Sequence, residues 1–136
     1  VVSAHGANFV KSMLRLSETR DKLTIVADQI GGPTPAGPLA AACLAAVEAL
    51  KTDASLSGTY HFAGAPDVSW ADFAREIFRQ AGRDVVVEDI PTTAFPTPAR
   101  RPHNSRLDCS TLDRLGISRP DWKAELTKIL KELETA

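Results

Sequence analysis

One segment limits most strongly what this chain can fold into: residues 91–107, which read PTTAFPTPARRPHNSRL. The segment holds four prolines, three arginines, a histidine and an asparagine, and its apolar residues follow no helical or strand period. Each proline removes a backbone donor and fixes φ, so the segment forms neither a helix interior nor a central strand. We therefore predict a stiff basic loop. Because guanidinium groups bind phosphate through paired hydrogen bonds, the loop is a candidate anion clamp.

The rest of the chain has an ordinary globular composition. Of its 136 residues, 43% are hydrophobic and 24% are charged, and the formal net charge is -1. This fits about one domain, and the near-zero charge argues against a general nucleic-acid binder. No run approaches the roughly 18 apolar residues of a membrane span, and no signal peptide is visible. We expect a cytoplasmic protein in which Cys43 and Cys109 are free thiols.

Apolar periodicity and capping residues predict five helices. Asn8, Ser69 and Asp121 are the expected N-caps, and Ser69 forms a capping box with Asp72. The expected helices cover residues 8–20, 39–51, 69–81, 108–116 and 121–133. In the second helix, Leu39, Leu44 and Val47 are predicted to lie along one side. In the fourth, Ser110 and Asp113 have capping-box spacing.

Three short apolar runs predict strands, at residues 23–27, 59–62 and 84–90. Three strands close no large sheet, so we expect an α+β fold that packs against, or completes, a larger α/β domain. A loop over residues 28–35 follows the first strand, and such loops commonly hold ligands in α/β proteins. Its Asp28, Gln29 and Thr34 could hydrogen-bond a sugar or a base.

Several signatures of catalysis and metal binding are missing from these 136 residues. Neither a P-loop nor a Gly-x-Gly-x-x-Gly motif occurs. Tyr60 is the only tyrosine, and Gly64 stands four positions later, so the chain has no Tyr-x-x-x-Lys pair. No cluster of carboxylates and histidines suggests a metal site. Because the chain starts at Val1 and its only methionine is Met13, we expect it to be part of a longer protein.

Three segments together resemble one family. They are residues 8–14 (NFVKSML), residues 28–34 (DQIGGPT) and the basic segment 91–107. The first two have counterparts throughout sugar-nucleotide epimerases and dehydratases, whereas the third is much more specific. The chain resembles the C-terminal part of the dTDP-4-dehydrorhamnose reductases, which are extended short-chain dehydrogenase/reductases, over essentially its whole length.

The resemblance implies a reaction and a division of labour. In this family, NADPH or NADH delivers hydride to the C4 ketone of dTDP-4-dehydro-L-rhamnose, which gives dTDP-L-rhamnose for polysaccharide synthesis. An N-terminal Rossmann domain carries the cofactor loop and the Tyr-x-x-x-Lys pair. Residues 1–136 would then be the C-terminal substrate-binding region of a Rossmann-fold reductase without its cofactor domain. We expect this chain alone to be inactive.

The resemblance also implies a substrate site. Asn8 and Phe9 would approach the nucleotide-sugar, and Arg101, with Asn104 and Arg100, would hold its diphosphate. The second motif would line the sugar or deoxythymidine side through Gln29, Gly32, Pro33 and Thr34. Asp28 in the same motif could instead hold the loop in place. No catalytic residue and no metal ligand is assigned within the chain.

Assembly and identity leave alternatives open. Some family members dimerise through a carboxylate-bound Mg²⁺, but residues 35–39 here contain no carboxylate, which makes a metal-bridged dimer doubtful. The expected partners are the dTDP-sugar and the protein's own Rossmann domain, and a homodimer stays open. The alternatives are another sugar-nucleotide epimerase or dehydratase, a non-catalytic regulatory subunit like that of methionine adenosyltransferase, and a self-contained phosphate-binding module.

Overall fold

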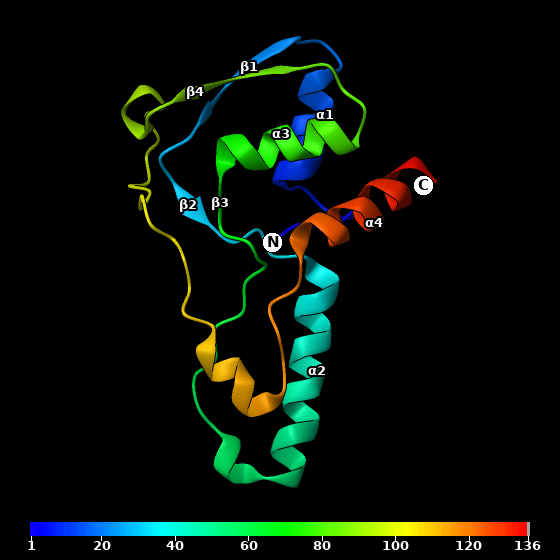
Figure 1. Ribbon diagram of the computed structural model, residues 1–136, viewed down its shortest axis with the longest axis vertical. Helices are drawn as coiled ribbons and strands as arrows, with labels where there is room; N and C mark the ends of the chain where they lie inside the picture. Colours follow the sequence, from blue (N-terminus) through cyan, green and yellow to red (C-terminus); the bar gives the residue numbers. More distant parts are fainter. Residues whose placement is uncertain (136) are drawn as a thin grey trace.

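The computed structural model describes residues 1–135, which form an α+β fold (Figure 1). The elements follow in the order α1 (Phe9–Ser17), β1 (Lys22–Val26), β2 (Ile30–Gly31), α2 (Ala36–Thr52), η1 (Ala54–Leu56), β3 (Val68–Ser69), α3 (Trp70–Gln80), β4 (Val86–Ile90), η2 (Thr92–Ala94), η3 (Ser110–Leu115) and α4 (Trp122–Glu134), where η denotes a 3-10 helix. The expected α+β class is confirmed. The fourth helix expected from the sequence is the 3-10 helix η3.

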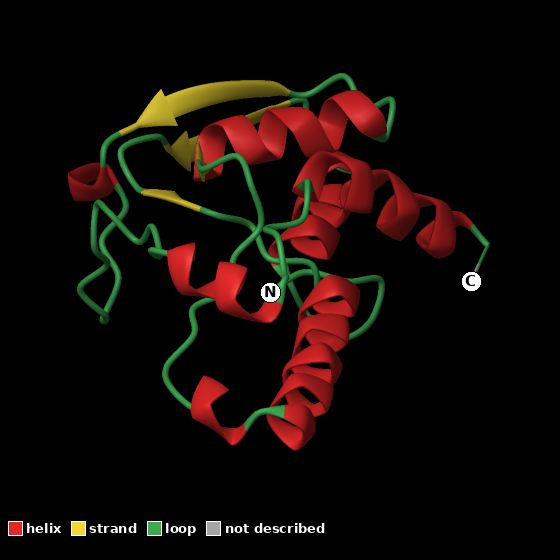
Figure 2. Cartoon of the chain, turned by 60° about the horizontal axis from the view of Figure 1, so that its bottom comes forward, coloured by secondary structure: helices red, strands yellow, loops and turns green. Residues whose placement is uncertain are grey.

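The upper part of the molecule in Figure 1 is built around α3. We call this part the head; it comprises residues 1–35, 63–107 and 119–135. The apolar face of α3 is buried against β1 and β4 and against α1 and α4. Figure 2 shows α3 lying beneath the longer strands. The buried residues of α3 are Ala71, Phe73, Ala74, Ile77 and Phe78.

Two small sheets complete the head. β1 and β4 pair in parallel, from Lys22 opposite Val86 to Val26 opposite Ile90, and β2 and β3 form an antiparallel pair two residues long. Side chains alternate along a strand, so Leu23 and Ile25 enter the core while the intervening residues face outward. The short β2–β3 pair was not predicted, because two residues carry no readable period.

Three predicted N-caps are confirmed. The side chains of Asn8, Ser69 and Asp121 accept hydrogen bonds from backbone N–H groups in the first turns of α1, α3 and α4. In the capping box, the carboxylate of Asp72 accepts from the Ser69 hydroxyl at 3.0 Å. The cap predicted at Ser110 is wrong. Instead Asp108 accepts from the Ser110 N–H at 2.9 Å, because an aspartate two residues earlier forms a local turn of its own.

The lower part of Figure 1 consists of α2, η1, η3 and their connections. We call this part the stalk; it comprises residues 36–62 and 108–118. Helix α2 begins three residues before the predicted start, because Pro38 lies in the first turn, where its missing N–H is tolerated. Leu39 is half-buried, whereas Leu44 and Val47 are exposed. The prediction that these three share one side is therefore wrong.

The strand predicted at residues 59–62 is also wrong. These residues are irregular, and no strand lies beside them in the described part of the chain. The side chain of Tyr60 makes two contacts within the stalk. Its hydroxyl donates to the Leu56 carbonyl, and its ring centroid lies 5.9 Å from the guanidinium carbon of Arg114. Side-chain contacts hold this connection in place of a backbone ladder. Within residues 1–135, no helix is both long and apolar enough to cross a membrane.

Candidate functional site

The site is organised around the end of β1, where Asp28 meets Thr92. The Asp28 carboxylate accepts hydrogen bonds from the Thr92 N–H at 2.9 Å and from the Thr92 hydroxyl at 2.6 Å. These bonds hold the pKa of Asp28 below its ordinary value. Asp28 therefore fastens the start of the basic loop, which agrees with the role that the sequence suggested for it. Gln29 donates to the same threonine hydroxyl at 3.2 Å.

The far end of the basic loop is fastened to β2. The Ile30 N–H donates to the His103 carbonyl, and the Ser105 N–H donates to the Ile30 carbonyl, each at 2.8 Å. A Cβ on Gly31 would meet the Ser105 hydroxyl, so the Ser105 side chain would have to move to accommodate any other residue there. As predicted, the segment forms neither a long helix nor a central strand; it contains the single turn η2 and a one-residue bridge.

A second close approach fixes residues 32–34. A Cβ on Gly32 would meet the Gly64 carbonyl, and a Cβ on Gly64 would meet the Pro33 carbonyl. Both glycines are therefore required by backbone contact, although neither has a positive φ. The Thr34 hydroxyl donates to the Gly32 carbonyl at 3.0 Å and closes the turn. The second sequence motif is thus a rigid wall.

The N-terminus of α1 supplies the opposite wall. Asn8 caps this helix, and its amide nitrogen donates to the carbonyls of Ser3 and His5, at 2.8 and 3.3 Å. These bonds hold residues 3–8 against the helix, and they engage the side-chain amide of Asn8 within the protein. The ring of the next residue, Phe9, lies 4.8 Å from Trp70 and 5.5 Å from Phe73, measured between ring centroids.

A cleft of about 240 Å³ lies between these walls. One side is aromatic and the other is polar backbone, which suits a ligand that has a flat or apolar part and a hydrogen-bonding part. The lining residues are Val1, Val2, Phe9, Gln29, Gly31, Gly32, Pro33, Thr34, Ala63, Val68, Ser69, Trp70, Phe73, Ser105 and Leu107.

Five of the nine predicted site residues line this cleft: Phe9, Gln29, Gly32, Pro33 and Thr34. The other four do not. Asn8 lies beneath the wall as a helix cap. Asn104 is exposed and accepts from the Arg106 N–H at 3.1 Å. Arg100 and Arg101 are exposed on the free part of the basic loop.

Sequence reasoning missed Trp70 in the cleft. Trp70 lines the cleft, and its exposed fraction is 43%. Its position directly after the Ser69 cap was the available signal, because the first residue of a helix often lies at the rim of the packed face. Ser105 was missed as well, and it reaches the cleft only because the loop is fastened to β2.

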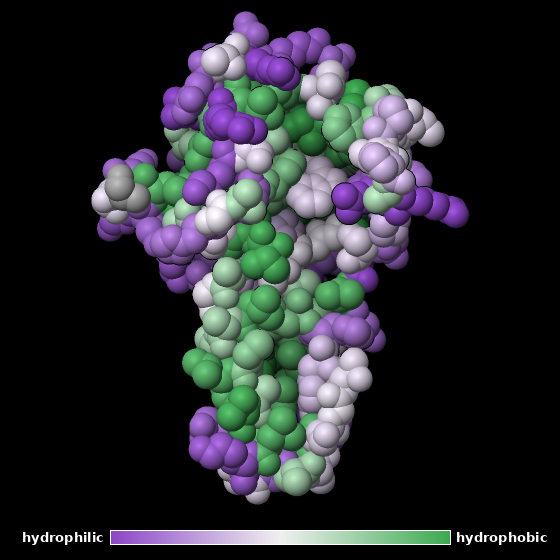
Figure 3. Space-filling model, turned by 180° about the vertical axis from the view of Figure 1, so that it is seen from behind, coloured by the Kyte–Doolittle hydropathy of each residue, from purple (hydrophilic) through white to green (hydrophobic). Residues whose placement is uncertain are grey.

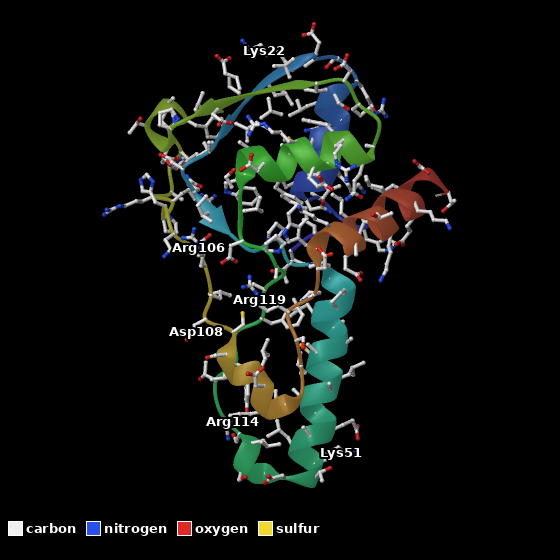
Figure 4. The ribbon with its side chains drawn as sticks, in the orientation of Figure 1. Lys22, Lys51, Arg106, Asp108, Arg114 and Arg119 are labelled. Atoms are coloured by element: carbon white, nitrogen blue, oxygen red, sulfur yellow. The ribbon has the colours of Figure 1, made fainter. Side chains whose placement is uncertain are left out.

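A charged network lies in the head, at its border with the stalk. Arg119 donates to the carbonyls of Ala63 and Gly64, at 3.2 and 2.6 Å, and to the Asp67 carboxylate at 2.6 Å. Arg106 approaches the other oxygen of Asp67, at 3.6 Å. Figure 4 shows Arg106 and Arg119 at the junction of head and stalk. No motif had indicated this network, because its members are far apart in the sequence.

Metal binding finds no support in the described part of the chain: residues 1–135 contain no group of three or more histidine, cysteine, aspartate or glutamate side chains placed to hold an ion. The site therefore offers hydrogen bonds, aromatic surface and a nearby basic loop. Such features suit the binding and orientation of a ligand. They supply neither a redox group nor a paired proton donor.

Comparison with known proteins places this site in a family. A model for the RmlD substrate binding domain matches residues 1–135. The chain belongs to this family. The dTDP-4-dehydrorhamnose reductase of Sinorhizobium fredii is 42% identical over 137 residues, which cover 96% of this chain and 46% of that protein. The reductase of Aggregatibacter actinomycetemcomitans is 45% identical, covering 92% of this chain and 45% of that protein.

Solved structures agree with the family assignment. A dTDP-4-dehydrorhamnose reductase from Clostridium acetobutylicum superposes with a TM-score of 0.87 at 38% identity, covering 95% of this chain and 45% of that one. The enzyme from Bacillus anthracis, solved in complex with NADP, gives a TM-score of 0.81 at 36% identity, covering 94% of this chain and 44% of that one. The chain spans about half the length of the relatives that it matches.

Proposed function

We propose that this chain is the substrate-binding part of a dTDP-4-dehydrorhamnose reductase. The whole enzyme would reduce dTDP-4-dehydro-L-rhamnose to dTDP-L-rhamnose with NADPH or NADH, for the synthesis of rhamnose-containing polysaccharide. The family match over residues 1–135 carries the proposal. The cleft supports it, because Phe9 of the first family-like motif and Gln29 and residues 31–34 of the second line it.

The proposed division of the site follows from its geometry. The cleft, through Phe9, Gln29 and residues 32–34, receives the nucleotide-sugar. The basic loop begins and ends beside this cleft, so Arg100, Arg101 and Asn104 can meet the diphosphate from the solvent side. Asn8 acts indirectly by fixing the helix end that presents Phe9. A charged hydrogen bond from arginine to phosphate is the strongest single contact in this scheme.

The chemical step belongs to residues outside this chain. Reduction of a ketone needs a bound nicotinamide and a proton donor for the developing alkoxide. The residues present do not fit a dinucleotide, because the chain has no glycine-rich phosphate loop and no Tyr-x-x-x-Lys pair. We therefore assign cofactor binding to an N-terminal Rossmann domain of the whole protein. The relative from B. anthracis was solved in complex with NADP, which supports NADP as the cofactor of the whole enzyme.

Two measurements test the proposal directly. Calorimetric titration of the chain with dTDP is expected to show binding, and the absence of binding by the folded chain would count against the cleft. Incubation of the chain with NADPH and the keto-sugar is expected to leave NADPH unoxidised. Stoichiometric oxidation would overturn the division of labour, since it would place the chemistry within residues 1–136.

One substitution tests the loop. In the whole enzyme, Arg101→Ala should raise the KM for the sugar nucleotide by a loss of about 1.5–3 kcal/mol, roughly 10- to 100-fold, because a charged hydrogen bond to the diphosphate disappears. Arg83→Ala is the matched control, since Arg83 is an exposed arginine in the turn between α3 and β4. If KM is the same in both variants, Arg101 does not contact the substrate.

A further inference from the structure

Asp67 lies between the wall of the cleft and the far end of the basic loop. It directly precedes Val68 and Ser69, which line the cleft. Its carboxylate contacts two arginines, one on each oxygen: Arg119 at 2.6 Å and Arg106 at 3.6 Å. Within residues 1–135, these two arginines form ion pairs with this carboxylate alone. Asp67 is therefore the shared partner of both.

Arg119 fixes the Asp67 carboxylate on the side of the cleft wall. Its guanidinium also donates to the carbonyls of Ala63 and Gly64, at 3.2 and 2.6 Å. Gly64 in turn lies so close to the Pro33 carbonyl that a Cβ would not fit between them. The planar fork of an arginine suits such a set of simultaneous acceptors. The wall of the cleft, rather than the basic loop, thus sets the position of Asp67.

Arg106 connects this carboxylate to the basic loop. The side-chain oxygen of Asn104 accepts from the Arg106 N–H at 3.1 Å and from its guanidinium at 3.3 Å. An amide group has one acceptor oxygen and one donor NH2. Because Arg106 engages the oxygen, the NH2 group is the part of Asn104 that remains for a ligand. An anion accepts hydrogen bonds, so this orientation of the amide suits a phosphate.

The charges of this network also suit an anionic ligand. Two arginines and one aspartate contribute +2 and −1, so the net charge is +1. Both oxygens of the carboxylate face a guanidinium, which reduces its repulsion of a nearby anion. Figure 4 shows the two arginines at the junction of head and stalk, whereas the rear view in Figure 3 shows mostly apolar side chains along the stalk. The network therefore adds positive charge beside the end of the basic loop.

We propose that Asp67 is a positioning residue for the diphosphate of the nucleotide-sugar. Asp67 holds Arg106, and Arg106 holds the Asn104 amide with its NH2 group presented to the ligand. Asp67 itself does not touch the substrate. This inference rests on the proposed function, which assigns the diphosphate to the basic loop.

The first test is Asp67→Asn in the whole enzyme that contains this chain. The substitution keeps the size of the side chain and removes its charge, so Arg106 loses its ion-pair partner. The KM for the dTDP-sugar and the Kd for dTDP should each rise about 3- to 10-fold, while kcat and the KM for NADPH stay as in the wild type. A lower unfolding temperature with unchanged KM and Kd would show a merely structural role and would overturn the proposal.

A double-variant cycle shows whether Asp67 acts through Arg106. Arg106→Gln should raise the same KM and Kd by a similar factor. The variant that carries both substitutions should then be no worse than the more affected single variant, because both remove the same interaction. Factors that multiply would mean that the two residues act independently, which contradicts the proposal.

Asp89→Asn is the matched control. Asp89 on β4 also pairs with an arginine, Arg75 at 2.6 Å, and does not line the cleft. The same substitution there should leave KM and Kd at their wild-type values. If Asp67→Asn does not fold, Arg106→Gln alone decides, since the Arg106 side chain is 48% exposed. Unchanged KM and Kd in Arg106→Gln would overturn the proposal.

The same measurements separate this proposal from the proposed function. Reductase activity with an unchanged KM in Asp67→Asn removes the positioning role and keeps the proposed function. Binding of dTDP by a wild-type enzyme that does not reduce the keto-sugar removes the proposed reaction, and the Kd for dTDP in Asp67→Asn still decides the positioning role. A wild-type enzyme that neither binds dTDP nor reduces the keto-sugar removes both.

Discussion

The head and the stalk use apolar residues in opposite ways. The head buries aromatic and aliphatic side chains from three helices and strand β1 in one cluster. Within residues 1–135, no stalk residue belongs to that cluster, and α2 leaves Leu44, Val47 and Leu50 exposed. The difference lies in what packs against the helices. In the head, α3 packs against two helices and two strands, whereas α2 contacts the short helices η1 and η3.

The difference indicates which part of the chain is more stable against unfolding. Burial of apolar area is the main favourable contribution to folding, and it is proportional to the area removed from water. Trp122 and Phe73 meet edge to face at 5.0 Å in the centre of the head. In the stalk, Leu112 is the large side chain that is fully covered. We therefore expect the head to melt last.

The largest effect is expected in the head core. Trp122→Ala should lower the free energy of unfolding by about 3–5 kcal/mol, because the ring is 1% exposed and its nitrogen donates to the Pro66 carbonyl at 2.7 Å. Leu44→Ala in the stalk is the control and should change it by less than about 0.5 kcal/mol. Urea denaturation measures both. Equal losses would break the distinction between head and stalk.

The junction should show the next largest effect. Arg119→Ala should cost about 1.5–3 kcal/mol, because it leaves two backbone carbonyls and the Asp67 carboxylate without their charged donor. Arg119→Lys keeps the charge but loses the planar fork, so it should recover only part of the loss. Thermal unfolding of the wild-type protein and the two variants measures the difference. An unchanged unfolding temperature in Arg119→Ala would mean that these hydrogen bonds do not stabilise the head.

A smaller, local effect is expected where Asp28 fastens the basic loop. Its pKa is lowered by the Thr92 hydrogen bonds, so the fastening is complete above the ordinary value of 3.8 and is lost as pH falls below it. Asp28→Ala should increase protease cleavage within residues 92–105 at neutral pH. Asp53→Ala in the stalk is the control, because Asp53 caps only the adjacent Ser55. Equal cleavage in both variants would contradict the role of Asp28.

The smallest effect on stability is expected from two ion pairs, one in the head and one in the stalk, whose partners are each three residues apart. In α3, Arg79 lowers the pKa of Glu76 to about 2 from 4.5. Because the folded-state pKa is lowered, the contribution to stability is complete above pH 4.5 and disappears as pH falls toward 2. Glu76→Gln should therefore flatten the pH dependence of unfolding in this window. Glu48→Gln in α2 is the comparison, since both partners of that ion pair are exposed; an equal change in both variants would remove the contrast.

The sequence predicted the head better than the stalk. In α1, α3 and α4, a polar N-cap residue precedes an amphipathic stripe. Both signals lie within the local sequence, so the presence of these helices and their N-terminal ends were predicted correctly. Tyr60 and its neighbours have the composition of a strand. A strand also needs a second strand beside it, and the local sequence does not show whether one is there. The exposure of Leu44 and Val47 could not be predicted either, because an apolar residue does not reveal whether its partner is present.

The candidate site was predictable only in part, for a similar reason. Motif resemblance predicted Phe9, Gln29 and residues 32–34, and these residues line the cleft. Trp70, Ser105 and the Arg119 network depend on segments that meet only after folding. Whether Arg100 and Arg101 touch a diphosphate stays a prediction, since both lie outside the cleft.

The two fastenings of the basic loop have a consequence for how fast and how often it meets a ligand. Thr92 is held by Asp28 and His103 by Ile30, so the two anchored residues are fixed two and four positions after the end of β1. Arg100 and Arg101 are three and two residues from the His103 anchor, so their backbone stays within about 11 Å of it. Under the proposed function, this anchor would keep both arginines close to a ligand seated in the cleft, at a high effective concentration.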